Sequence, residues 1–208
     1  MDTLSQLFGS ALRVKMMRLF LFNAGSAFDA DSIAIKTGSR IKEIEAEAAF
    51  MKKMGLVKPT RLSKIVAVKK GKKTSEKKVS VKAWRLDAKF QFLEALTGFL
   101  VKTHSVEYKS MLKKLEKAGK IKAALISGVF IQNADARLDM LVVGDNVKSG
   151  SMDRVIKSIE SDMGKDIRYT VLSTQDFSYR VGMNDRLIRD IFDFPHKILL
   201  DKIGLPTK

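Results

Sequence analysis

Residue types that carry out catalysis are sparse in this sequence. It has no cysteine and only two histidines, His104 and His196, which lie far apart and have no metal-ligand spacing around them. Residues 71–74 (GKKT) match the end of a phosphate-binding loop, but the upstream glycine and the following helix of such a loop are missing. No serine stands in a Gly-x-Ser-x-Gly nucleophile elbow. The sequence therefore excludes disulfides, thiolate zinc sites and cysteine nucleophiles, and it offers charge as its main chemistry.

Positive charge is concentrated in one segment of the chain. The net charge is +16 over 208 residues, and residues 58–89 alone hold 12 Lys/Arg against 2 Asp/Glu. Residues 91–208 are close to balanced, with 19 Lys/Arg and 15 Asp/Glu. A solvated charged surface or a flexible loop without a ligand is the plain alternative, but concentration in one segment favours a polyanion as partner.

The elements before this basic segment are predicted to be helices. Apolar residues recur at three- and four-residue steps over residues 4–20, which predicts one amphipathic helix. Asp29 or Asp31 is placed to cap a second helix, which ends at a tight break over residues 37–39. Ser39 can then cap a third helix.

The third helix is predicted to have two different faces. Its apolar face gathers Ile41, Ile44, Ala48 and Met51, and its opposite face gathers Lys42, Ala46, Ala49, Phe50 and Lys53. Small residues on the outward face would let the helix approach a groove of DNA closely, and Arg40 and Lys42 lie near its N-terminus, where such helices reach bases or phosphates. Because Glu43 and other carboxylates on this helix repel phosphates, we expect most of the affinity to come from the basic segment.

The basic segment is predicted to be a β-hairpin, with strands over residues 64–69 and 79–86 and a basic loop over residues 70–78. Helix, short helix, turn, helix and hairpin is the order of a winged helix-turn-helix. The first 90 residues thus resemble winged-helix transcriptional regulators, through residues 12–21, 32–38, 41–57 and 84–86. The resemblance implies binding to double-stranded DNA. The candidate DNA contacts are Arg40, Lys42, Lys53, Lys64, Lys69, Lys70, Lys72, Lys73, Lys77 and Lys78.

Residues 90–118 form two apolar helical stretches that are predicted to connect two domains. Packing against a core explains their apolar residues, and a homodimer surface is the alternative left open. From residue 119 the pattern changes to strands over 123–126, 138–144 and 167–172, a helix capped by Ser151, and two amphipathic helices through about Ile203. Alternating strands and helices predict a small α/β domain.

Residues 119–208 resemble the minimal nucleotidyltransferase family, through the strand that ends in Ser127-Gly128, the strand over 138–144 that ends before Asp145, and the stretch over 173–177. Active members of that family hold nucleotide phosphates with a Gly-Ser turn and bind Mg²⁺ with two aspartates two residues apart and a third carboxylate. Here the turn is reversed, Arg137 stands where the first aspartate is expected before Asp139, and the third position falls at Arg168 or Tyr169. The resemblance therefore implies a catalytically degenerate domain without a metal or cofactor. Its candidate ligand-binding residues are Ser127, Gly128, Arg137, Asp139 and Arg168.

The sequence thus predicts an α+β protein with a winged helix-turn-helix over 1–89, connecting helices over 90–118 and a small nucleotidyltransferase-like α/β domain over 119–208. We expect a cytoplasmic, prokaryotic type of transcriptional regulator that binds duplex DNA and is not an enzyme. No signal peptide or apolar run of 18 residues is present, so no membrane span is expected. The alternatives are a Mg²⁺-dependent transferase of nucleotides to protein or RNA that uses Asp139, and an antitoxin-like module that binds an acidic protein.

Overall fold

A computed structural model describes residues 3–70, 73–102, 108–133 and 135–206 of the chain. It divides the chain into two compact units, Met1–Thr103 with Ser161–Gly164 and His104–Glu160 with Lys165–Lys208. The boundary between residues 103 and 104 lies inside the segment expected to connect two domains. Helices and strands occur in both units, so the predicted mixed α+β class is confirmed at this level.

The first unit combines helices with a small antiparallel sheet. Its elements are α1 (Thr3–Phe8), α2 (Ala11–Phe22), β1 (Ala27–Asp29), α3 (Ala30–Thr37), α4 (Ile41–Lys53), β2 (Val57–Lys70), β3 (Lys73–Leu86), α5 (Leu93–Thr97) and the π-helix η1 (Gly98–Lys102). The strand order in the sheet is β1-β3-β2.

The single helix expected over residues 4–20 is wrong, because the chain breaks between α1 and α2. Gly9 has a φ of +73°, which an α-helix does not contain. Ser10 then caps α2 by accepting a hydrogen bond from the backbone N–H of Arg13 at 3.1 Å. A glycine followed by a capping serine overrides the apolar periodicity that continues through them.

The turn between α3 and α4 follows from a cap at each end of α3. Asp29 is the N-cap and accepts from the N–H of Ser32 at 3.0 Å, which decides between the two aspartates expected there. Gly38 ends α3 in the left-handed conformation, with a φ of +66°. The cap expected from Ser39 is wrong, because α4 starts one residue later and Arg40 occupies its N-cap without a side-chain hydrogen bond.

The core of the first unit lies between the helices and the base of the sheet. Ile44, Ala48 and Met51 of α4 are completely buried there, together with Phe20 of α2 and Ile33 of α3. Trp84, Leu86 and Val57 bring the start of the hairpin into the same core. Ile41 does not belong to this apolar face, since 46% of its surface is exposed in the first turn of α4.

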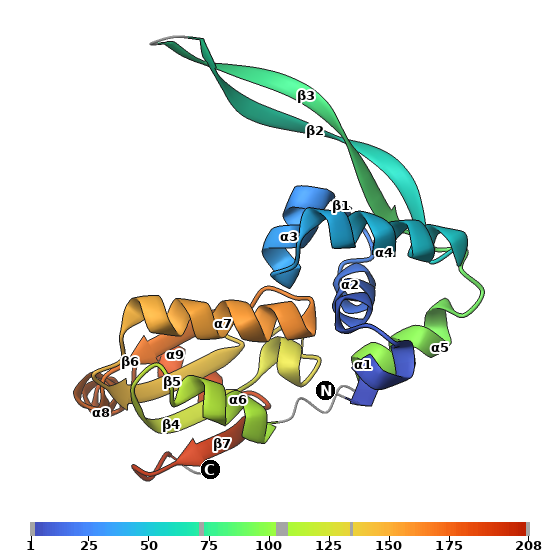
Figure 1. The fold of residues 1–208 in the computed structure, drawn as a ribbon. Coiled ribbons are helices and arrows are strands. Elements are labelled where there is room, and N and C mark those ends of the chain that lie inside the picture. The colour runs from blue at the N-terminus through green and yellow to red at the C-terminus, as the bar shows by residue number, and fades with distance from the viewer. Residues whose placement is uncertain (1–2, 71–72, 103–107, 134, 207–208) are drawn as a thin grey trace. The chain divides into compact units, whose positions relative to one another are not determined.

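The hairpin is longer than expected, and the described residues of the predicted nine-residue basic loop, Lys70 and residues 73–78, belong to its strands. β2 and β3 have 14 residues each and pair without a bulge from Val57 opposite Leu86 to Lys70 opposite Lys73. β1 adds to β3 only at Ala83–Arg85, so the remaining ribbon has two strands. Figure 1 shows this twisted ribbon continuing beyond the helices of its own unit. Residues expected in the loop, among them Thr74, Ser75, Lys77 and Lys78, take part in strand pairing instead.

The second unit is built on one four-stranded sheet. Its elements are α6 (Tyr108–Leu115), β4 (Lys120–Ile126), the 3₁₀ turn η2 (Gly128–Phe130), β5 (Met140–Asp145), α7 (Ser149–Met163, of which the residues from Ser161 on are grouped with the first unit), β6 (Tyr169–Leu172), α8 (Thr174–Gly182), α9 (Arg186–Asp193) and β7 (Lys197–Asp201). The strand order is β6-β5-β4-β7, in which β5 and β6 are parallel and the other pairs are antiparallel.

Two details of this unit differ from the sequence-based expectation. The last expected helix is wrong over β7, because Phe194 before Pro195 adopts an extended backbone and the apolar run after it pairs with β4. α7 begins at Ser149, so Ser151 lies inside the helix and is not its cap. The sheet packs on one side against helices: Ala123, Leu125, Leu141 and Val143 lie in one buried cluster with apolar residues of α8 and α9. None of the described helices has the length and hydropathy needed to cross a membrane.

The left-handed turn at Gly38 gives a direct test of this local structure. Gly38→Ala should lower the free energy of unfolding by about 1 kcal/mol, because a Cβ disfavours a positive φ even where space is open. Chemical denaturation of the two proteins measures this difference. Gly25→Ala is the matched control, since Gly25 also has open space around it but no positive φ, and it should change stability little. Equal losses at both positions would contradict the role of Gly38 as the end of α3.

Candidate functional site

The outward face of α4 carries small and basic side chains in solvent. Lys42, Ala46, Ala49 and Lys53 are all exposed, on the side of the helix opposite Ile44 and Met51. Arg40 is exposed just before the first turn. Three of the candidate DNA contacts, Arg40, Lys42 and Lys53, therefore stand on one exposed element.

One of the carboxylates on α4 is neutralised within the unit. Glu47 accepts hydrogen bonds from Nε and Nη2 of Arg13 at 2.9 and 3.3 Å, and the guanidinium of Arg13 lies 3.9 Å from the ring centre of Phe50. Glu47 is also only half-exposed, whereas Glu43 and Glu45 lie in solvent at the sides of the helix. The negative charge facing outward from α4 is thus smaller than its three glutamates suggest.

Lys64 differs from the other candidate contacts because its ammonium is engaged inside the unit. It pairs with Asp29 and lies 3.4 Å from Oδ2 of Asp31. The hydrogen bond to Asp29 raises the pKa of Lys64 above its ordinary value. Burial alone would raise the pKa of Asp29, but the bonds from Lys64 and Ser32 hold it below its ordinary value. Lys64 therefore fastens β2 to the start of α3.

The hairpin has two faces that strand pairing defines. Its polar face contains Arg61, Ser63, Ile65, Glu76, Lys78, Ser80 and Lys82, all of them exposed. Its apolar face contains Leu62, Val66, Val79 and Val81, which are half-buried. Lys77 lies opposite Val66 on the apolar face and is exposed. The side chains of Lys69, Lys70 and Lys73, and all of Lys72, lie outside the described residues.

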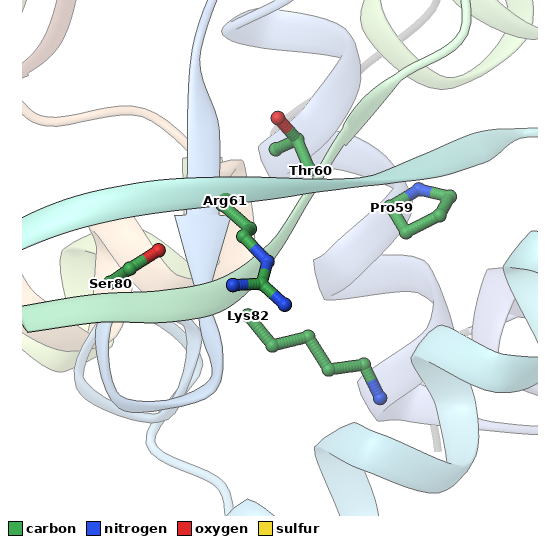
Figure 2. A pocket seen from close by; sticks show the side chains of 5 residues that line it. All are labelled: Pro59, Thr60, Arg61, Ser80 and Lys82. Carbon is green, nitrogen blue, oxygen red and sulfur yellow. The ribbon is translucent and has the colours of Figure 1, made fainter.

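Two cations at the base of the polar face were not among the predicted contacts. Arg61 and Lys82 are direct cross-strand partners and line a pocket of about 460 Å³ together with Pro59, Thr60 and Ser80. Figure 2 shows both long side chains reaching out from neighbouring strands on the same side of the ribbon. Within the described part of the chain neither has an acidic partner, although Lys82 Nζ lies 5.1 Å from the ring centre of Trp84. The strand predicted from the sequence began at residue 64, whereas β2 begins at Val57. A predicted strand with the earlier start would have placed residues 61, 63 and 65 on one face by alternation.

Two like charges opposite each other in a sheet destabilise it unless something neutralises them. Arginine and lysine donate hydrogen bonds well to phosphate, and the hydroxyl of Ser80 adds a third donor beside them. The pocket is therefore suited to bind an anion, and phosphate is the anion that this set of donors fits.

A second group of candidate residues meets around Asp139 in the second unit. The Asp139 carboxylate is completely buried and accepts four hydrogen bonds: from the N–H of Val129 at 2.9 Å, and from the N–H, Nε and Nη2 of Arg168 at 2.8, 2.9 and 3.0 Å. Burial alone would raise the pKa of Asp139, but these donors hold it below its ordinary value. Both carboxylate oxygens are thus occupied by the chain itself.

Ser127 and Gly128 are packed against this carboxylate and present no open turn to a ligand. The Ser127 hydroxyl is buried and donates to the carbonyl of Leu138. Gly128 has a φ of +51°, and a Cβ there would lie 1.9 Å from Oδ1 of Asp139. The glycine is required because the turn closes directly over the aspartate.

The remaining candidate residues of the second unit stand apart from this group. Arg137 is 57% exposed, and its Nε pairs with Oδ2 of Asp190 on α9 at 3.2 Å. Arg137 therefore forms an ion pair at the surface of its own unit. His196 packs its ring against Phe192, and His104 lies outside the described residues. In the described ranges, no three histidine or acidic side chains gather as a metal site would need.

The chain was compared with protein families, curated protein sequences and solved structures. No protein-family model, no curated protein sequence and no solved structure matches the chain.

The Asp139 network predicts a large effect of one carboxylate on stability. Asp139→Ala should lower the free energy of unfolding by roughly 3–5 kcal/mol, because it leaves the guanidinium of Arg168 and two N–H groups without their acceptor. Chemical denaturation at pH 7 measures the loss. Asp135→Ala is the matched control, since Asp135 is exposed in the same loop and should change stability by less than about 0.5 kcal/mol.

The pH dependence of this loss has a defined direction. A carboxyl whose pKa is lowered in the folded state stabilises it fully above its unfolded pKa of about 3.9, and this contribution is lost as the pH falls through the folded pKa. The difference in unfolding free energy between wild type and Asp139→Asn should stay constant above about pH 5 and narrow in acid. A difference that grows in acid would contradict the ionised state of Asp139.

Proposed function

We propose that the first unit is a winged helix-turn-helix that binds duplex DNA, and that the protein regulates transcription. The observation that carries this proposal is the Arg61–Lys82 pair, two like charges held opposite each other over a pocket, without an acidic partner in the described part of the chain. A phosphate of the DNA backbone supplies the missing negative charge. Contacts of this kind hold a protein on DNA without distinguishing sequences.

Phosphate binding by the hairpin accounts for where the charge of the chain lies. The net charge of +16 is far from evenly spread, and Lys78 carries positive charge further along the face of the Arg61–Lys82 pair, while Lys77 is exposed on the other face of the ribbon. Each phosphate that a lysine or arginine neutralises releases counterions, so affinity falls steeply as salt rises.

Sequence discrimination is assigned to α4. Its outward face has two alanines at its centre, which permit close approach to a major groove of about 12 Å width, and Lys42 and Lys53 flank them. Arg40 and Lys42 at the N-terminal end are the side chains with reach to base edges. The turn at Gly38 and the buried Ile44 and Met51 hold this face outward.

For the second unit we propose a nucleotidyltransferase-like domain without catalytic activity, which serves assembly or the sensing of a ligand. Support comes from Asp139, whose two oxygens are occupied by Val129 and Arg168. A carboxylate that must coordinate Mg²⁺ needs an oxygen free to do so. Incubation with labelled nucleoside triphosphates and Mg²⁺ tests this part: label incorporated by wild type and lost in Asp139→Asn would show that the domain is an enzyme.

The hairpin contribution is tested by charge reversal. Arg61→Glu with Lys82→Glu should weaken binding to a mixed-sequence duplex at least tenfold near 100 mM salt, because two attractive interactions with phosphate become repulsive. The slope of log affinity against log salt should flatten by roughly 2, at about 0.9 for each phosphate that is no longer neutralised. Fluorescence anisotropy between about 50 and 300 mM salt measures both quantities.

A second double charge reversal, in the other unit, tests whether DNA affinity depends on where the charges lie or only on the net charge of the protein. Lys117→Glu with Lys157→Glu changes the net charge by the same amount at exposed positions of the second unit and should leave affinity within about threefold. Equal losses of DNA affinity in the two double variants would show that the hairpin is not the DNA-binding site. Absence of wild-type binding at the lowest salt would refute DNA binding as a whole.

The assignment of sequence discrimination to α4 gives a separate prediction. Lys42→Ala should change the sequences that wild type enriches from a random duplex library and lower its preference for them about tenfold, since a good base contact is worth about 1–3 kcal/mol. Lys52→Ala is the control on the same helix, because Lys52 is exposed but lies about 100° around the helix from the outward Lys53. Lys82→Ala should instead weaken binding to all sequences alike. Unchanged sequence preference in Lys42→Ala would contradict the assignment.

A further inference from the structure

The polar face of the hairpin contains one apolar side chain that its surroundings do not explain. Ile65 is 69% exposed, and its cross-strand partner is Lys78. The neighbouring pair on the same face is Ser63 with Ser80, and the next is Arg61 with Lys82. An isoleucine thus projects into solvent from a face whose neighbouring side chains are hydroxylic or charged, with the cations Arg61, Lys78 and Lys82 and the carboxylate of Glu76 on it.

Packing within the hairpin is provided by the opposite face. Leu62 lies opposite Val81 and Val66 opposite Lys77, and these apolar residues, together with Val79, are half-buried. Ile65 cannot join them, because successive side chains of a strand point to opposite sides. Ile65 therefore adds little to the stability of the ribbon, and it leaves an apolar surface on a strand without a further neighbour, where such surfaces favour aggregation.

The position of Ile65 relative to the Arg61–Lys82 pair suits a particular contact with DNA. Four residues of an antiparallel strand span about 13 Å, so an apolar side chain stands at a fixed distance from two cations on the same face of a regular ribbon. Proteins that bend DNA combine these two features: cations hold the backbone while an apolar wedge enters the minor groove and partly unstacks one base step.

We propose that Ile65 is such a wedge, and that the hairpin bends duplex DNA by inserting it between base pairs from the minor groove. This inference rests on the proposed DNA binding of the first unit and adds a mechanical function to it. The Arg61–Lys82 pair holds phosphate beside the wedge, and Lys78, the cross-strand partner of Ile65, neutralises phosphate next to the opened step. Steps that unstack easily, such as TA and CA, are the preferred points of insertion, so shape contributes to recognition without hydrogen bonds to bases.

The experiment measures binding and bending in the same sample. A duplex of about 30 base pairs with a central TA step and a donor and an acceptor dye at its ends reports bending by energy transfer, and the anisotropy of one dye reports binding. Wild type at saturation should raise energy transfer. Ile65→Ser should lose more than half of this rise while its affinity falls less than tenfold, and the salt dependence should stay that of wild type because no charge changes.

Two further variants exclude simpler explanations. Ile35→Ser is the matched control, since Ile35 is 83% exposed on α3 and the same change there should leave bending intact. Ile65→Leu keeps an apolar wedge and should retain most of the bending. Circular dichroism and a thermal melt show whether each variant is folded.

The outcomes separate this inference from the function on which it rests. Wild-type binding without a change in energy transfer overturns the wedge and leaves DNA binding standing. Bending by Ile65→Ser equal to that of wild type does the same. Absence of wild-type binding to this duplex at low salt overturns both the proposed function and the wedge.

Discussion

The register of β2 against β3 is the constraint on which the surface of the first unit depends. Val57 and Leu86 are paired at the start of the hairpin and are buried in the core with Trp84, so the pairing is fixed where it leaves the body of the unit. No bulge interrupts the pairs that follow. A shift by one residue would exchange the two faces of the ribbon and move Arg61 to the apolar side. The core therefore determines, through pairing alone, which cations of the ribbon face the same way.

Asp29 connects this ribbon to the helices, because it has three roles at once. It is the last residue of β1, it caps α3 through the N–H of Ser32, and it pairs with Lys64 of β2. Two partners bind its carboxylate from two elements, so the direction of α3 and the position of the hairpin base are coupled. The sequence pattern groups Lys64 with the solvent-exposed lysines, but in the structure Lys64 holds the hairpin against the start of α3.

The features that could be predicted from the sequence are those that a few neighbouring residues determine. The cap at Asp29, the turn at Gly38 and the buried side of α4 follow from residue types within one or two turns of helix. Features that depend on distant partners were missed. The hairpin length follows from pairing between residues 57–70 and 73–86, and β7 forms because β4 offers an edge to an apolar run that could equally be helical. The occupied carboxylate of Asp139 requires Arg168, which lies 29 residues further along the chain.

The Arg61–Lys82 pair differs from the ion-paired cations of the chain, and this difference supports the functional proposal. Four cations of the second unit have counter-charges of their own chain: Lys122 with Asp145, Arg137 with Asp190, Arg168 with Asp139, and Arg180 with Asp185. A polyanion would have to break such pairs to bind there. On the polar face of the hairpin the opposing cations Arg61 and Lys82 have no acidic partner among the described residues, so binding a phosphate removes a repulsion and breaks no ion pair. Positive charge is thus available to a partner at the Arg61–Lys82 pair, whereas the cations of these four ion pairs are already neutralised within the chain.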